Sequence, residues 1–188
     1  MIIETRRLVL RDFEVADAVA YCRLTSDPKY QRFYSEEDCS EGKSRQLVAM
    51  FAEQAQEECR MKFQMAIELK ESGAFIGTAG LRIEPEQQAS IGCGVGRAHQ
   101  TAGYAEEAMA ALLDYGFNIH NLHRVYAETI AENKPAIRLC KKLGMREEGR
   151  FIDNRYFKAK WWSTVVMAML KSEWERKCAA GKKRYEEN

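Results

Sequence analysis

A short apolar segment, a glycine-bearing loop and an amphipathic helix follow one another between residues 91 and 117. The apolar segment reads IGCGV, and the loop after it contains Gly96 and Gly103. Apolar residues then recur at the spacing of one helix face, at Ala105, Met109, Leu112, Leu113 and Phe117. We therefore predict that a strand passes through this loop directly into a helix, which restricts the chain to folds that mix strands and helices.

Such a loop is suited to binding an anion. The first N–H groups of a helix lack internal partners, and the helix dipole favours negative charge there. A glycine at position 103 can take a positive φ and let a phosphate approach the backbone closely. Residues 100–105 are predicted to wrap a pyrophosphate, and an ordinary strand-to-helix turn is the alternative reading of the same Gln-x-x-Gly-x-Ala pattern. The loop lacks the glycine spacing of dinucleotide-binding folds and the Gly-Lys-Ser/Thr of a P-loop.

The rest of the chain alternates between the two kinds of periodicity. Strands are predicted over residues 2–13, 62–69, 75–83, 89–95, 125–130, 145–151 and 161–169, and a long polar link over 152–160 joins the last two. Further helices are predicted over about 12–27, 40–60 and 133–144. This order predicts an α+β fold, or an α/β fold with a mixed sheet. We expect α+β, with a mixed, mostly antiparallel sheet of about seven strands. We expect one domain, residues 1–176, and a basic, frayed tail at 177–188.

Composition excludes several classes of protein. A net charge of +1 provides no global attraction to nucleic acid or to an anionic membrane. No apolar run approaches the roughly 20 residues of a membrane span, and the N-terminal residues are charged too early for a signal peptide. The six cysteines form no Cys-x-x-Cys pair. We expect a cytoplasmic protein with reduced thiols, no metal site, and neither nucleic acid nor membrane as a partner.

Five segments in a fixed order resemble a known family. They read ETRRLVLRDFEVADA, FIGTAGL, HQTAGYAEEA, ENKPAIRLCKKLGMREEGRF and WWSTVVMAMLKSEW, and together they extend over nearly the whole chain. The pattern resembles the GNAT superfamily of acetyl-CoA-dependent N-acetyltransferases, in the ribosomal-protein-alanine (RimJ/RimL-like) branch. The resemblance implies helices on both faces of a twisted sheet, with a V-shaped splay between the strands at 89–95 and 125–130.

The same resemblance implies where acetyl-CoA binds. The main-chain N–H groups of the loop would hold the pyrophosphate, and the strand that ends at Val95 would pair with the pantetheine arm. Asn133 would hydrogen-bond that arm from the other side. The loop residues concerned are Gln100, Thr101, Ala102, Gly103, Tyr104 and Ala105.

The catalytic positions depart from the family pattern. Ala136 and Cys140 stand where relatives carry a serine and a tyrosine that assist the leaving thiolate. Positions where relatives carry carboxylates are occupied by Ser90, Arg155 and Ser163. Two side chains remain as candidates for proton transfer, Cys140 and Glu84. Their alternatives are a packed small side chain for the first and an ordinary surface turn residue for the second.

Two functions are compatible with these residues. The first is transfer of an acetyl group from acetyl-CoA to a primary amine, either a protein N-terminus, a polyamine or a small-molecule amine, by direct attack in a ternary complex. The second is a CoA-binding sensor or interaction module that has lost turnover. A homodimer is a further expectation.

Overall fold

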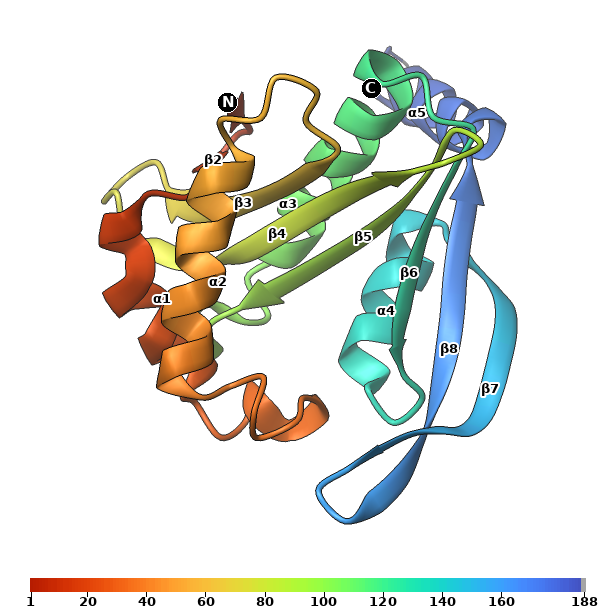
Figure 1. Ribbon diagram of the computed structural model, residues 1–188. Coiled ribbons are helices and arrows are strands. Elements are labelled where there is room, and N and C mark those ends of the chain that lie inside the picture. The colour runs from red at the N-terminus through yellow and green to blue at the C-terminus, as the bar shows by residue number, and fades with distance from the viewer. Residues whose placement is uncertain (187–188) are drawn as a thin grey trace.

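The computed structural model describes residues 1–186, with side chains described as far as residue 180. Eight strands in this part form one sheet in the order β1-β2-β3-β4-β5-β6-β8-β7 (Figure 1). The strands are β1 (Ile2–Glu4), β2 (Leu8–Asp12), β3 (Lys62–Leu69), β4 (Phe75–Glu84), β5 (Gln88–Val95), β6 (Arg124–Ile130), β7 (Arg146–Phe157) and β8 (Lys160–Leu170). The α-helices are α1 (Ala18–Thr25), α2 (Glu41–Gln54), α3 (Tyr104–Asp114), α4 (Lys134–Leu143) and α5 (Lys171–Glu186). Short helical turns are η1 (Val15–Asp17), η2 (Gln31–Phe33), η3 (Arg97–His99) and η4 (Tyr115–Ile119).

Helices cover both faces of the sheet (Figure 1). Phe63, Met65 and Ile67 alternate along β3 and join the main core, which also contains the buried faces of α3 and α4. Ala66, which points to the opposite face, joins a second core with residues of α1 and α2, including Phe51. The period of two along β3 therefore assigns each side chain to one of the two layers.

The strands β5 and β6 open into a V. They pair in parallel over only three residues each, Gln88 to Ser90 and Arg124 to Tyr126. β5 remains paired with β4 along its whole length to Val95, while β6 continues to pair with β8. Beyond Ser90 the two strands diverge, as Figure 1 shows. The predicted fold class and splay are confirmed.

The first predicted strand is corrected by the structure. Residues 2–13 form two short antiparallel strands, so the sheet has eight strands where about seven were predicted. A turn interrupts the run because the Thr5 hydroxyl accepts a hydrogen bond of 2.9 Å from the Leu8 N–H. The Thr5 N–H donates at 2.9 Å to the Leu8 carbonyl in the same turn.

The predicted polar link at 152–160 is also corrected. β7 and β8 form one long hairpin that includes most of those residues. Its two-residue turn consists of Lys158 and Ala159, which both take a positive φ, 53° and 52°. Such turns usually carry Asn or Gly, and neither is present to signal the hairpin.

At the C-terminus, α5 continues to Glu186, past the predicted domain end at residue 176. The predicted tail at 177–188 is thus helical as far as it is described, and residues 187–188 lie outside the described residues. In the described part of the chain, no helix has both the length and the apolar character needed to cross a bilayer.

Candidate functional site

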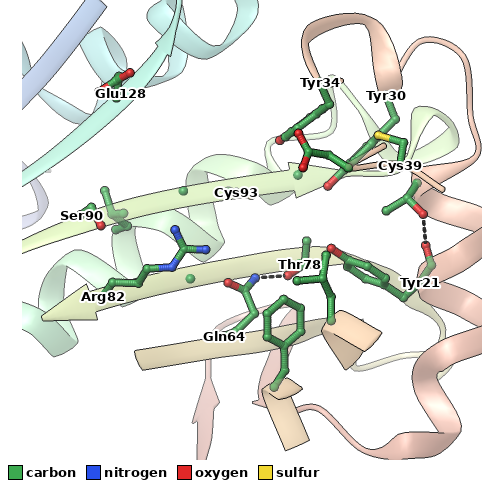
Figure 2. Close-up of a pocket in the computed structure, with 18 of the residues that line it drawn as sticks. Tyr21, Tyr30, Tyr34, Cys39, Gln64, Thr78, Arg82, Ser90, Cys93 and Glu128 are labelled. Atoms are coloured by element: carbon green, nitrogen blue, oxygen red, sulfur yellow. Dashed lines mark hydrogen bonds between the residues drawn. The ribbon is translucent and has the colours of Figure 1, made fainter. Parts of the chain in front are cut away.

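A cavity of about 570 Å³ lies on the face of the sheet covered by α1 and α2, at the open side of the V. Its floor is formed by β3, β4 and β5, and β6 and the β7–β8 hairpin contribute to its walls. Figure 2 shows side chains from β3, β4, β5 and β6 and from residues 30–39 around one space. The residues used below are Tyr21, Tyr30, Tyr34, Asp38, Gly80, Arg82, Ser90, Gly92, Cys93, Gly94, Tyr126, Glu128 and Arg155.

Glycines on the floor of this cavity leave space that side chains would otherwise fill. Gly80 and Gly92 lie opposite each other in the β4–β5 register. A Cβ atom on Gly92 would meet no heavy atom within 4 Å, so the space above it is open. A Cβ on Gly94 would approach the Tyr30 hydroxyl to 2.6 Å. Side chains here would therefore fill the cavity or displace its wall.

Tyrosines form one wall. The rings of Tyr30 and Tyr34 stack with centroids 5.4 Å apart and an interplanar angle of 7°. Burial raises the pKa of Tyr30 well above the usual value, and it raises the pKa of Tyr21 to about 12. Both hydroxyls are therefore protonated near neutral pH, and the Tyr30 hydroxyl is hydrogen-bonded to that of Tyr34.

The β7–β8 hairpin closes the cavity from the far side. Lys158 Nζ, at the hairpin turn, donates a hydrogen bond of 2.7 Å to the carbonyl oxygen of Gln31 in η2. Phe33 packs edge-on against Trp162 with centroids 6.0 Å apart. These contacts join two segments that are far apart in the sequence and place Arg155 of β7 on the cavity lining.

The edge of β5 that faces the V is free beyond Ser90. The Gly96 N–H bonds the Ile76 carbonyl at 2.8 Å, so even-numbered residues of β5 direct their main-chain groups to β4. Ile91, Cys93 and Val95 therefore direct theirs into the gap. The Val95 carbonyl accepts a hydrogen bond of 3.1 Å from Gln100 Nε2, which ties the strand to the loop that follows.

That loop presents unpaired amides at the start of α3. Gly103 has φ of 82° and forms the N-cap, and Thr101 has φ of 71°. A positive φ on a non-glycine residue costs about 1–3 kcal/mol and is concentrated at functional sites. Among the described residues, the N–H groups of residues 101–106 have no acceptor, so they are free for an anion.

Arg7 and Glu107 hold the loop from outside. Glu107 accepts hydrogen bonds from Thr5 Oγ1, from the Arg7 N–H and from Arg7 Nε, each 2.7 Å long. Arg7 Nη1 donates at 2.9 Å to the Ala102 carbonyl, and the guanidinium lies 4.4 Å from the ring centroid of Tyr104. The turn between β1 and β2 therefore fixes the shape of the loop.

Asn133 lies at the N-terminus of α4. Its Oδ1 caps the helix by accepting from the Ala136 N–H at 3.3 Å, and its Nδ2 donates to Thr129 Oγ1 at 3.2 Å. These two bonds orient its amide at the end of β6. Its contact with a pantetheine arm stays a prediction.

The two candidates for proton transfer lie in different surroundings. Cys140 is 4% exposed and packs in the main core with Ile137 and Leu143, and burial raises its pKa to about 11. It is not among the cavity residues. Glu84 accepts hydrogen bonds of 2.8 and 3.0 Å from the hydroxyl of Tyr126, which does line the cavity. Glu84 therefore reaches the site through Tyr126, and the structure does not bring Cys140 to it.

Sequence reasoning missed the polar face of the cavity. Tyr126 and Glu128 alternate with buried Val125 and Ala127 along β6, and both line the cavity. Arg82 occupies the corresponding face of β4. The signal was the period of two in these strands, which separates a polar face from an apolar one. Tyr30 and Tyr34 lie in an irregular segment, which carries no such signal.

Comparison with known proteins agrees with this geometry. A family model described as an acetyltransferase (GNAT) domain matches residues 7–146. A Bacillus licheniformis protein named uncharacterized N-acetyltransferase p20 is 33% identical over 175 residues, which cover 90% of this chain and 96% of the relative. The crystal structure of a GNAT-family acetyltransferase from Bacillus anthracis has a TM-score of 0.80 at 29% identity, covering 92% of this chain and all of the other.

A further solved structure shares the fold. It is the spermidine N-acetyltransferase from Vibrio cholerae in complex with CoA and spermine, with a TM-score of 0.77 at 22% identity and coverage of 90% of this chain and 99% of the other. The splay between β5 and β6, the free edge of β5 and the loop before α3 all lie within the matched acetyltransferase domain. The chain belongs to the GNAT acetyltransferase family and is an acyltransferase.

Proposed function

We propose that this protein transfers the acetyl group of acetyl-CoA to a primary amine held in the cavity, by direct attack of the amine within a ternary complex. The observation that carries the proposal is the course of β5. This strand forms part of the cavity floor at Gly92, offers a free edge at the V, and ends in the loop of unpaired amides at 101–106. One strand thus connects the space for an amine with the place for a pyrophosphate.

The residues present fit acetyl-CoA, which supplies an activated acetyl thioester. The free amides of residues 101–106 and the left-handed Gly103 suit a pyrophosphate. The main-chain groups of Ile91 and Cys93 suit the amides of a pantetheine arm, which would extend the sheet as a further strand does. Asn133 stands at the end of β6, across the gap from this edge.

The proposed step forms one bond and breaks another. The amine nitrogen bonds to the acetyl carbon, the carbon–sulfur bond breaks, and the proton that the nitrogen loses on becoming an amide passes to the departing thiolate. The acceptor must first lose the proton of its ammonium form. We assign this proton to Glu128, because it lines the cavity on β6 and has no ion-pair partner within the described part of the chain. General bases contribute about 10²–10⁴-fold to a rate.

The acceptor is a primary amine. The RimJ/RimL-like resemblance favours a protein N-terminus, and a polyamine is the acceptor named for the Vibrio cholerae enzyme. That enzyme is 22% identical to this chain, so its acceptor has to be tested here directly. The volume of about 570 Å³ is within the range of small-molecule sites, which extends from about 300 to 1,000 Å³.

Release of the CoA thiol tests the proposal. Purified protein incubated with acetyl-CoA and no amine should release thiol only at the background rate. Release should be faster when an accepted amine from a broad panel is added. Glu128→Gln should lower kcat by about a hundredfold and leave acetyl-CoA binding unchanged. Absence of amine-dependent release over the whole panel, in protein that binds acetyl-CoA, would contradict the proposal and favour a CoA-binding sensor.

A further inference from the structure

Three charged side chains line the cavity without an ion pair. Arg82, Glu128 and Arg155 have no salt bridge or side-chain hydrogen bond to any described residue. The fourth charged side chain on the lining, Asp38, accepts a hydrogen bond of 2.6 Å from Ser35 Oγ. Most other arginines of the sheet are paired. Arg11 bonds Asp17 and Glu68, and Arg124 bonds Glu148.

The positive charge of Arg82 and the negative charge of Glu128 lie on different strands. Arg82 on β4 is opposite Ser90 on β5, and Ser90 is opposite Tyr126 on β6. Glu128 is two residues beyond Tyr126 on the same face. Because β5 lies between β4 and β6, the backbones that carry the cation and the carboxylate are about 10 Å apart or more. Figure 2 shows Arg82 and Glu128 at separate positions around one space.

Arg155 adds a second cation from the hairpin. Its strand is held against η2 by the bond from Lys158 to Gln31, and Arg155 lines the same cavity as Arg82 and Glu128. Guanidinium groups bind carboxylates and phosphates through paired N–H donors. A polyamine, in contrast, would bring additional positive charge to two unpaired cations, and like charges repel, although solvent screens the repulsion because both arginines are exposed.

We infer that the acceptor is a small molecule that carries an anionic acid group, a carboxylate or a phosphonate, in addition to its primary amine. The amine lies at Glu128 and the acid group at one of the two unpaired guanidiniums of the lining, Arg82 on β4 or Arg155 on β7, which lie on either side of β6 in the sheet order. The stacked rings of Tyr30 and Tyr34 line the space between α1 and the floor. This inference rests on the proposed function, since it names the acceptor of the same cavity.

Matched pairs of acceptors test it. Each amino acid and each aminoalkylphosphonate is compared with its methyl ester or with the amine that lacks the acid group, and spermidine is included. The readout is kcat/KM from thiol release. The acid should be preferred at least tenfold within the pairs that are accepted. Comparison of the accepted amino acids with the accepted aminoalkylphosphonates shows which of the two acid groups the site prefers.

Arginine variants provide the second part of the test. At least one of Arg82→Gln and Arg155→Gln should lower kcat/KM for the acid at least tenfold more than kcat/KM for its neutral partner, and both should leave the Kd for acetyl-CoA unchanged. Arg176→Gln, an exposed arginine of α5 outside the cavity, is the matched control and should keep the preference.

The outcomes separate the two claims. Turnover of neutral amines or spermidine at rates equal to or above those of the acids would overturn the inference and leave the proposed function in place. An acid preference that survives both arginine variants would also overturn it. Binding of acetyl-CoA without turnover of any amine would overturn the proposed function, and the inference with it.

Discussion

Arg7 Nη1 donates a hydrogen bond of 2.9 Å to the carbonyl oxygen of Ala102, 95 residues further along the chain. The same guanidinium pairs with Glu107 one turn into α3. A residue from the β1–β2 turn thus bridges the last part of the anion loop and the first turn of the helix. We conclude that contacts within the protein hold the conformation of the loop, so the proposed pyrophosphate site does not need a ligand in order to form.

Removal of this bridge should weaken acetyl-CoA binding. Arg7→Gln loses the charged bond to Ala102 and the pairing with Glu107, at a cost of about 1.5 kcal/mol or more for hydrogen bonds to charged groups. The Kd for acetyl-CoA, measured by calorimetry, should therefore rise about tenfold. Arg6→Gln is the control, because Arg6 is exposed and its side chain makes no hydrogen bond or ion pair among the described residues. Equal Kd values for the two variants would contradict the role given to Arg7.

Glu107 should make stability depend on pH in the acid range. Burial raises the pKa of Glu107, but hydrogen bonds from Thr5 and Arg7 outweigh it and leave the pKa below the usual value. A lowered folded pKa contributes stability above the unfolded value of about 4.3, and that stability is lost as the pH falls through the folded pKa. Urea unfolding of Glu107→Gln should show a weaker loss of stability below about pH 4 than the wild type. Parallel curves for the two proteins would argue against this ion pair.

The loop should require Gly103 both to adopt its conformation and to bind acetyl-CoA. Gly103→Val places a β-branched residue at φ of 82°, where it is strained by about 1–3 kcal/mol. Acetyl-CoA binding should be abolished while the circular dichroism spectrum stays that of a folded protein. Gly73→Val has a similar backbone, φ of 67°, on the turn between β3 and β4, and should lose stability yet bind acetyl-CoA normally. Wild-type affinity in the Gly103 variant would show that the pyrophosphate lies elsewhere.

Gly92 tests the cavity separately from the loop. Gly92→Val puts a side chain into open space, so the protein should fold and bind acetyl-CoA as before while turnover of the amine falls at least tenfold. Gly149→Val, also in a strand and also without a neighbour within 4 Å, provides the control. Unchanged turnover in the Gly92 variant would mean that the acceptor does not use this cavity.

Cys140 should contribute to packing rather than to proton transfer. Its thiol is buried in the core, and Cys140→Ala should lower the free energy of unfolding by about 1–2 kcal/mol. The kcat should change less than twofold. A hundredfold fall in kcat, the scale expected for a lost general acid, would restore Cys140 as the catalytic acid.

Local patterns predicted the half of the site that is continuous in sequence. The strand at 89–95, the loop and α3 follow one another, so periodicity and one glycine were enough to predict them. The splay was implied by family resemblance and is present between β5 and β6. The positive φ at Gly103 is where the anion-loop interpretation required it.

The cavity could not be predicted in the same way. Its walls come from residues 30–39, β6 and the β7–β8 hairpin, which meet only in the folded chain. The hairpin was missed because Lys158 and Ala159 form its turn without the residues that favour positive φ. Without the hairpin, Arg155 had no place on the cavity lining, and the charge of the acceptor could not be considered.

The most direct test of the account is thermal unfolding with and without acetyl-CoA, with NAD as the control ligand. Acetyl-CoA at about 100 times its Kd should stabilise the protein by about 2.7 kcal/mol, which raises the Tm by about 5–10 °C for a chain of this size. NAD should leave the Tm unchanged. A shift with acetyl-CoA alone is the predicted result, and an unchanged Tm with saturating acetyl-CoA would contradict the assignment of the loop and of the β5 edge.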